Sequence, residues 1–236
     1  MAEMKGESRN KNERLYNAIE NTLAHMHKRV SPKGQMEVLR NRYPSPTFML
    51  ESNTYMLTRV GLTRLDAFYY TAIPGLARRS AKDAFGTKPK LNKVSLMAEY
   101  LKSYFIGIHI ECFYLICLDR SGRLIDSILL QKGTTDRAPF YLKQMLSVAV
   151  QKESRAIVLC HNHPGGTLKP SKEDVVCTLQ ALKAMQATGV ALLDHIIIAG
   201  KNAVSMRECG LISSKVWSSQ NPSSPLLRYW LDLPLL

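Results

Sequence analysis

The run from Ala156 to Gly189 constrains the fold more than any other part of the sequence, because it requires a strand to be followed closely by a helix. Residues 156–160 (AIVLC) are apolar and partly β-branched, which is typical of a short buried strand. Residues 164–166 (PGG) then break the strand pattern. From Pro170 the apolar residues follow helical spacing up to the glycine that ends the run. The run therefore predicts one strand and one helix of a larger core.

Two histidines lie where this strand ends. Side chains two residues apart in a strand point to the same face, so His161 and His163 can present imidazole nitrogens to one ion, whereas Asn162 faces away. Asp174 falls in the first turn of the predicted helix and brings a carboxylate to the same junction. Three such ligands leave the fourth position of a tetrahedral zinc ion for water, which distinguishes a catalytic zinc site from a structural one. The sequence therefore predicts a catalytic zinc centre.

Both parts of this motif also have simpler explanations. Two histidines separated by one residue often occur by chance, and most histidines bind no metal. Ser171 and Asp174 also fit a capping box, in which the serine hydroxyl accepts a hydrogen bond from the first turn and the aspartate replaces the usual glutamate. We expect Ser171 to cap the helix, and a capping serine can still direct its hydroxyl towards an ion held nearby.

A candidate general base, Glu111, lies upstream of the histidines. Residues 112–118 form an apolar strand, and after a turn at residues 119–122 a second strand of a hairpin is predicted over 123–130. A carboxylate at the start of such a strand is costly to bury without a partner. Next to water activated by zinc, Glu111 could take a proton and later deliver it to a leaving amine. The alternative is a solvated glutamate at the edge of a sheet.

These residues together resemble RadC-type proteins of the JAB/MPN (JAMM) metallohydrolase superfamily. The signature of that superfamily is a glutamate followed much later by HxH, seven residues, a serine, two residues and an aspartate. The positions of this signature are filled by Glu111, His161, His163, Ser171 and Asp174. The RadC character comes from HNHPGG, PSKED, LLDHIIIAG and SMRECGLI, and the resemblance covers residues 111–212. Gly165 departs from the usual HNHPSG, outside the ligand positions.

The resemblance implies a role for each of these residues. His161, His163 and Asp174 would bind one Zn²⁺ per chain. Glu111 would activate water at the metal, and Ser171 would stabilise the oxyanion of a tetrahedral intermediate. The superfamily cuts peptide or isopeptide amide bonds, so the implied protein is a zinc metalloprotease with a protein or peptide substrate. RadC-type proteins are also associated with DNA repair, and the alternative is a metal domain that acts on nucleic acid or binds it without turnover.

The implied fold is α/β, with a JAB/MPN-like mixed sheet flanked by helices and a small helical region before it. The predicted order is compatible with that fold: strands 112–118 and 123–130, a helix at about 139–152, strand 156–160, a helix and a final strand. We divide the chain into an N-terminal helix with flexible ends (1–40), a small basic helical region (41–100), the RadC-like metallohydrolase domain (101–215) and a C-terminal tail (216–236).

Asp194 and His195 have two interpretations. A carboxylate beside a histidine could orient a zinc ligand from outside the coordination shell. We favour the other interpretation, a buried polar pair at the entrance of the strand that begins with HIIIAG. The cysteines are scattered and odd in number, five in all, which favours reduced thiols over a disulfide framework or a metal cluster.

Composition predicts a soluble cytoplasmic protein. The 236 residues suffice for one main core and a smaller appendage. No apolar run approaches the roughly 18 residues of a spanning helix, and the first residues, MAEMKGESRNKNERLYN, are charged rather than typical of a secretory signal. We therefore expect no membrane partner. The sequence indicates no oligomeric state.

Positive charge is concentrated in the N-terminal half. Residues 1–107 contain 18 Lys and Arg against nine Asp and Glu, a net charge of +9, whereas residues 108–236 carry +4 of the total of +13. These basic residues could neutralise nucleic-acid phosphates, or they could only keep the protein soluble. A candidate phosphate-binding cluster consists of Arg78, Arg79, Lys82, Lys88, Lys90 and Lys93.

Within this half, short helices are expected between turns at Pro44, Gly61 and Pro74–Gly75. Residues 58–67 (TRVGLTRLDA) weakly resemble the helix-hairpin-helix element that precedes the JAB domain in RadC proteins, and there Arg59 and Arg64 could contact phosphate. Thr63 replaces the second glycine of that element, which weakens the DNA-binding interpretation because a β-branched residue tolerates positive φ poorly. A second HxH, at His25 and His27, is predicted to lie on a helix, where the two side chains diverge.

Overall fold

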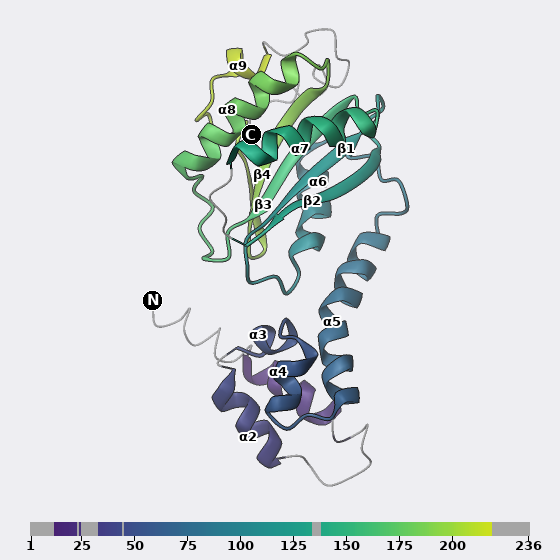
Figure 1. Ribbon diagram of the computed structural model, residues 1–236, viewed down its shortest axis with the longest axis vertical. Coiled ribbons are helices and arrows are strands. Elements are labelled where there is room, and N and C mark those ends of the chain that lie inside the picture. Colours follow the sequence, from purple (N-terminus) through teal and green to yellow (C-terminus); the bar gives the residue numbers. More distant parts are fainter. Residues whose placement is uncertain (1–11, 23, 25–32, 44, 134–137, 219–236) are drawn as a thin grey trace. The chain divides into compact units, whose positions relative to one another are not determined.

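The computed structural model describes residues 12–22, 24, 33–43, 45–133 and 138–218 (Figure 1). Contacts divide the chain into two compact units, Met1–Arg79 and Ser80–Leu236. His25, His27, Pro44 and the predicted tail beyond residue 218 lie outside the described residues. Among the helices that the structure describes, none has the length and apolar character needed to cross a bilayer.

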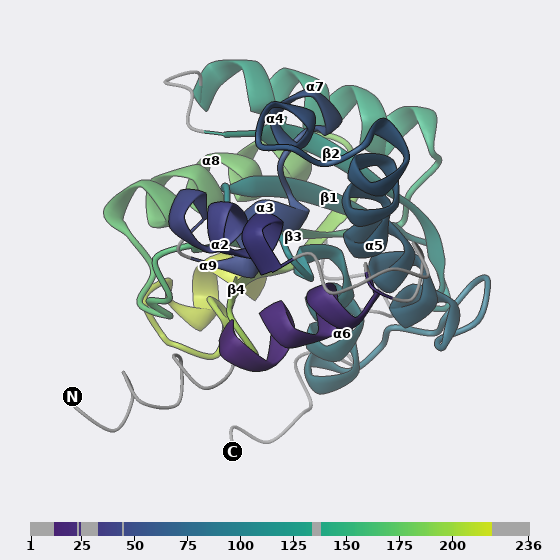
Figure 2. The same cartoon turned by 90° about the horizontal axis from the view of Figure 1, so that it is seen from below.

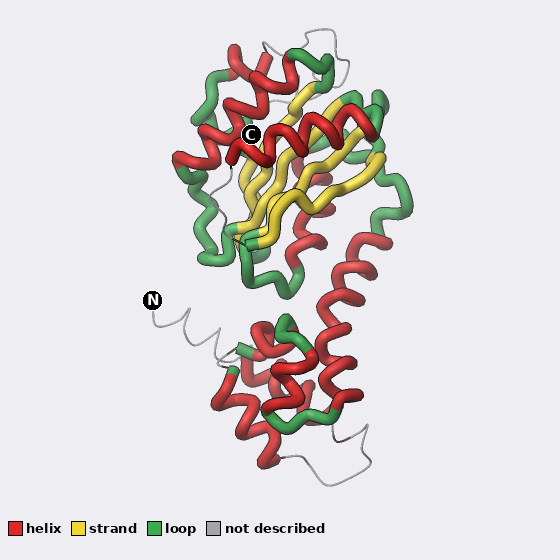
Figure 3. Tube along the Cα trace, in the orientation of Figure 1, coloured by secondary structure: helices red, strands yellow, loops and turns green. Residues whose placement is uncertain are grey.

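The second unit is built on a five-stranded sheet with the order β2-β1-β3-β4-β5. The strands of this unit are yellow in Figure 3. The strands are β1 (Cys112–Leu118), β2 (Leu124–Lys132), β3 (Ala156–Asn162), β4 (Ala191–Ala199) and β5 (Asn202–Ser205). β3 pairs antiparallel with β1 and parallel with β4. Parallel neighbours need a crossover, and α8 (Lys172–Gln186) supplies it. The sheet is mixed, which confirms the predicted α/β class.

Helices cover both faces of this sheet (Figure 2). α7 (Ala138–Gln151) and α8 pack on one face, where the short α9 (Ser214–Ser218) adds the buried Trp217. α6 (Val94–Lys102) and the short 3₁₀ helix η1 (Ser103–Phe105) pack on the other face. Residues 94–100, which we assigned from the sequence to the basic helical region, therefore belong to the core of the sheet unit.

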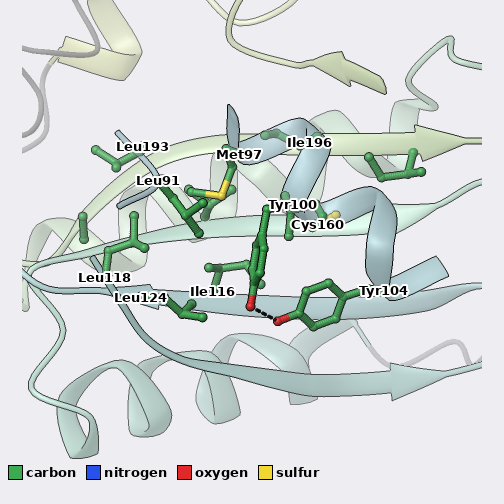
Figure 4. Close-up of a cluster of buried hydrophobic side chains, with 14 of the residues drawn as sticks. Leu91, Met97, Tyr100, Tyr104, Ile116, Leu118, Leu124, Cys160, Leu193 and Ile196 are labelled. Carbon is green, nitrogen blue, oxygen red and sulfur yellow. Dashed lines mark hydrogen bonds between the residues drawn. The ribbon is translucent and has the colours of Figure 1, made fainter. Parts of the chain in front are cut away.

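Alternation along the strands produces these two cores. In β3, Val158 and Cys160 join the cluster beneath α6, whereas Ile157 and Leu159 join the cluster beneath α7 and α8. Figure 4 shows the α6 core, in which the hydroxyl oxygens of Tyr100 and Tyr104 lie 2.8 Å apart.

β4 contains a one-residue bulge at Leu193. Ile157 of β3 pairs with Leu192, but the next residue, Val158, pairs with Asp194, so the register passes over Leu193. An extra residue in one strand reverses the alternation of every side chain beyond it. His195 consequently pairs with Leu159 and lies on the α7–α8 face.

Two predicted boundaries are wrong. The strand predicted to begin at His195 begins at Ala191, because the ladder with β3 starts there and buries Asp194 and His195 in the middle of β4. The turn predicted at Pro74–Gly75 lies inside a continuous helix, α5 (Arg64–Asp83). The buried face of α5, which includes Ala67, Tyr70 and Pro74, favours continuation of the helix over the local preference of proline.

The first unit is helical. Residues 12–22 precede α2 (Lys33–Arg42), α3 (Pro46–Leu50), α4 (Thr54–Arg59) and α5. The buried side chains of these helices, including Leu39, Met49 and Leu57, form a hydrophobic cluster of their own. A helical region before the sheet was part of the predicted fold, and that part is confirmed.

We expect Leu159→Ala to destabilise the sheet unit strongly. Leu159 is completely buried between β1 and β4, and truncation of such a leucine costs about 2–5 kcal/mol. Leu129 of β2, which is 42% exposed, provides a matched control, and Leu129→Ala should cost less than about 1.5 kcal/mol. Urea unfolding followed by circular dichroism would measure both. Equal losses of unfolding free energy would contradict the layered core.

Candidate metal centre

Three potential metal ligands converge at the end of β3. His161 Nε2 lies 2.9 Å from His163 Nε2 and 3.1 Å from Asp174 Oδ1. His163 Nε2 lies 3.4 Å from Asp174 Oδ2. One donor atom from each residue falls within 4.8 Å of the others. The structure thus brings together the three residues that the sequence singled out as zinc ligands.

Asp174 is held by the start of α8. Ser171 is the N-cap residue: its Oγ accepts a hydrogen bond from the Asp174 backbone N–H (3.0 Å), and Asp174 Oδ2 accepts one from the Ser171 backbone N–H (2.7 Å). The capping box expected from the sequence is therefore present. Burial alone would raise the pKa of Asp174, but hydrogen bonds and charge from His161, with hydrogen bonds from Ser171, hold that pKa below its ordinary value.

The loop after β3 orients His163. His163 Nδ1 lies 2.9 Å from the Thr167 carbonyl oxygen, which can only accept a hydrogen bond. Nδ1 must therefore carry a proton, and in neutral His163 the lone pair is on Nε2, the atom nearest Asp174. A Cβ at Gly165 would meet nothing within 4 Å, so the serine usual at this position would fit without disturbing the loop.

Glu111 immediately precedes β1. Two residues later, Phe113 pairs with His161 across the ladder and stacks on its ring, with centroids 5.6 Å apart and planes 10° apart. Glu111 lies just outside β1, where alternation predicts that its side chain shares the face of Phe113. The Glu111 carbonyl accepts a hydrogen bond of 2.7 Å from the Gly133 N–H at the end of β2.

Asn162 clamps the chain on both sides of Glu111. Its Oδ1 accepts a hydrogen bond from the Cys112 N–H (2.8 Å), and its Nδ2 donates one to the Ile110 carbonyl (3.0 Å). Only 4% of Asn162 is exposed, so these bonds form away from water. From the sequence Asn162 had only been assigned to the opposite face of the strand from the histidines. Spacing gives no signal for the clamp, because its partners lie about 50 residues away.

His195 is buried and hydrogen-bonded, as the interpretation favoured from the sequence expects, but it lies in the middle of β4 rather than at its entrance. It lies within hydrogen-bond distance of a candidate ligand, with Nε2 2.8 Å from His161 Nδ1, and its own Nδ1 lies 2.7 Å from Thr178 Oγ1. Its burial is complete, which lowers the pKa of the imidazole because the charged form is poorly solvated there. The bulge at Leu193 directs His195 to the same face as His161, a geometry compatible also with the other interpretation, support of a ligand from outside the coordination shell.

Asp194 points the other way and belongs to a separate network. Its carboxylate accepts hydrogen bonds from Ser205 Oγ (2.5 Å) and from the backbone N–H groups of His195 (2.7 Å) and Arg207 (3.2 Å). These contacts agree with the interpretation of Asp194 as a buried polar residue of the strand. Complete burial raises its pKa to about 7, although these hydrogen bonds and the charge of Arg207 oppose the shift.

The donor set suits zinc. Two imidazole nitrogens and one carboxylate are a common protein ligand set in catalytic zinc sites, and here they converge with little exposure of the side chains: 1% for His161, 15% for His163 and 12% for Asp174. Supporting hydrogen bonds from Thr167 and Ser171 hold two of the three ligands. The residues present therefore fit a single zinc ion.

Comparison with known proteins agrees with the resemblance found in the sequence. Residues 91–211, about half of the chain, match the RadC-like JAB domain. UPF0758 proteins of Shewanella sp. strain ANA-3 and Shewanella oneidensis strain MR-1 are each 33% identical over 138 residues, 58% of this chain and 61% of the relative. The UPF0758 protein of Shewanella amazonensis is 33% identical over 137 residues, with the same shares. The matched region thus covers less than two thirds of these relatives.

We expect Asp194 to make the stability of the protein depend on pH between about 4 and 7. The pKa of Asp194 is raised from 3.8 to about 7 in the folded state, so its contribution to stability is fully present below pH 3.8 and is lost as pH rises towards 7. The unfolding free energy of the wild type relative to Asp194→Asn should therefore fall over this range, by roughly 1–3 kcal/mol. Urea unfolding of both proteins at pH 5 and pH 8 checks this, and a constant difference would contradict it.

Proposed function

The chain belongs to the RadC-like JAB domain family, and on that premise we propose that it is a zinc-dependent hydrolase of the JAMM type that cleaves a peptide or isopeptide amide bond. The observation that carries the proposal is the convergence of His161, His163 and Asp174 on one point. The backbone on both sides of Glu111 is hydrogen-bonded to Asn162, the residue between the two histidines. Zinc held there would supply a Lewis acid for the carbonyl and would lower the pKa of nearby water.

Glu111 is proposed as the general base and then the general acid. As a carboxylate it takes a proton from the attacking water and later donates it to the leaving amine, so that the amide becomes an acid and an amine. Such a transfer requires the carboxylate to be placed precisely. The Asn162 clamp and the Gly133 hydrogen bond restrain the backbone on both sides of Glu111, which supports this role.

Ser171 is proposed to stabilise the oxyanion. Its Oγ accepts a hydrogen bond from the Asp174 N–H, and accepting that bond leaves its own proton available to a developing negative charge. The N-terminus of α8 adds the positive end of the helix dipole at the same place. Capping and catalysis are therefore compatible uses of one hydroxyl.

A cytoplasmic location and a protein or peptide substrate are also part of the proposal. None of the five cysteines, all of which lie in described residues, forms a disulfide, which supports a reducing cytoplasm. A protein or peptide substrate follows from the amide chemistry of the superfamily, not from the relatives, whose names state no activity.

A nucleic-acid role is a second candidate, supported by the net charge of +9 on residues 1–107. The turn between α4 and α5 weakens it. Thr63 Oγ1 accepts a hydrogen bond from the Asp66 N–H (3.1 Å) and donates one to Asp66 Oδ2 (2.6 Å), so a buried carboxylate and a hydroxyl occupy the helix start that a phosphate would need. In the proposed basic cluster, Arg78 is paired with Glu51 and Lys82 lies over the ring of Tyr104.

We expect the purified protein to bind one zinc ion, and His163→Ala to weaken that binding at least about 10-fold because a ligand is lost. Glu111→Gln should keep zinc but lower hydrolysis by about 100-fold or more. Elemental analysis and chelator competition measure the metal, and the Glu111→Gln protein can be used to trap substrates. Glu173→Gln, a neighbouring exposed carboxylate change, is the control. A metal-free wild type, or unchanged zinc binding in His163→Ala, would sink the proposal.

If the second candidate is correct, the full-length protein should bind DNA at low salt, with affinity that falls as salt rises. Arg59→Ala should reduce the slope of that dependence by about one ion, because one phosphate contact is lost. Lys201→Ala removes the same charge from the sheet unit and should change little. Fluorescence anisotropy against salt concentration measures both effects. Absence of binding at low salt would remove the candidate.

A further inference from the structure

A chain of hydrogen bonds connects one candidate zinc ligand to the backbone of another. His161 Nδ1 lies 2.8 Å from His195 Nε2, and His195 Nδ1 lies 2.7 Å from Thr178 Oγ1. Thr178 Oγ1 in turn lies 2.6 Å from the backbone carbonyl oxygen of Asp174, one turn earlier in α8. The chain thus begins at β3, crosses β4 and ends at the helix start that carries the third ligand.

The backbone carbonyl of Asp174, at the end of this series of hydrogen bonds, sets the donor and acceptor of every bond in the series. A carbonyl oxygen has no proton, so the Thr178 hydroxyl must donate to Asp174, as threonine commonly does in a helix. Thr178 Oγ1 has then used its only proton and must accept from His195 Nδ1–H. A neutral His195 has no proton on Nε2, which must therefore accept from His161 Nδ1–H.

The direction of the bond between His161 and His195 does not depend on the charge of His161. Whether the imidazole is neutral or protonated, Nδ1 is the donor to His195. In the neutral form the lone pair is left on Nε2, the atom that lies 3.1 Å from Asp174 Oδ1 and 2.9 Å from His163 Nε2. The opposite tautomer would direct a proton at the position that a metal must occupy.

Packing excludes water that could compete for these hydrogen bonds. His161, Thr178 and His195 each have an exposed fraction of 0%. The ring of Phe113 stacks on His161 and meets His195 edge to face, with centroids 5.6 and 5.4 Å away, so one aromatic side chain restrains both imidazoles. A hydrogen bond in such surroundings is costly to leave unmade, and the tautomer is correspondingly well defined.

We propose that His195 and Thr178 are positioning residues that hold His161 in its Nδ1–H tautomer, with the Nε2 lone pair directed at the metal position before any metal binds. This inference rests on the proposed function for its purpose, since the site must bind zinc for the tautomer to matter. The hydrogen-bond chain itself is a property of the metal-free protein. Because it ends on Asp174, it also ties the position of α8 to the orientation of His161.

The test uses the metal-free full-length protein labelled with ¹⁵N. At a pH high enough for His161 to be neutral, its ring nitrogens should give the pattern of an Nδ1–H tautomer, with a slowly exchanging Nδ1 proton. Thr178→Val replaces the hydroxyl by a methyl group and should abolish that pattern, whereas Thr178→Ser keeps the hydroxyl and should restore it. Ile197→Val, a buried neighbour of His195 on β4, controls for small packing changes.

Zinc affinity is the second measurement. His195→Leu should lower it about 10- to 100-fold, and Thr178→Val by a smaller factor of about 10, while Thr178→Ser and Ile197→Val stay within about 3-fold of the wild type. Thermal unfolding identifies any variant that fails to fold.

Two results would overturn the inference: an Nε2–H tautomer of His161 in the metal-free wild type, or a zinc affinity that does not change in folded Thr178→Val and His195→Leu. A wild type that binds no zinc but has the Nδ1–H tautomer would remove the proposed hydrolase and leave the hydrogen-bond chain intact.

Discussion

Pairing of β3 along both of its edges is the constraint on which the rest of the structure depends. β1 and β4 fix its register from either side, and all seven of its residues are buried. With its register fixed on both sides, the strand places His161 and the residue two positions later, His163, where their Nε2 atoms lie 2.9 Å apart. The same ladders bring Phe113 and His195 against His161 and bring the start of β1, with Glu111, beside Asn162.

Local features of the site could be predicted from the sequence, and non-local ones could not. The end of β3, the capping box of Ser171 and Asp174 and the first turn of α8 are each encoded within a few residues, so periodicity and capping rules suffice. The clamp by Asn162 and the contact of His195 depend on which strands become neighbours, and no spacing reveals this. The start of β4 was predicted too late in the sequence, because the polar residues Asp194 and His195 are typical of a strand end and not of the middle of a buried strand. In α5, burial of Pro74 overrode a local rule in the same way.

Backbone carbonyls orient the polar side chains of the site. His163 donates to Thr167, Asn162 to Ile110, and Thr178 to Asp174, and in each pair the acceptor is a main-chain oxygen that cannot reverse its role. A side-chain acceptor such as a hydroxyl could rotate or exchange donor and acceptor. Fixed acceptors therefore give each of these groups one orientation, which is the kind of preorganisation that electrostatic catalysis and metal binding require.

The bulge at Leu193 has a consequence for how related chains are compared. One residue that the β3 ladder passes over decides whether the histidine two positions later lies in the layer of α6 or in that of α7 and α8. Inserting or deleting an odd number of residues in this strand would therefore move the side chains beyond it to the opposite layer. An even number would leave them in the same layer. An alignment that matches the histidine letter but not this parity would equate two side chains on opposite sides of the sheet.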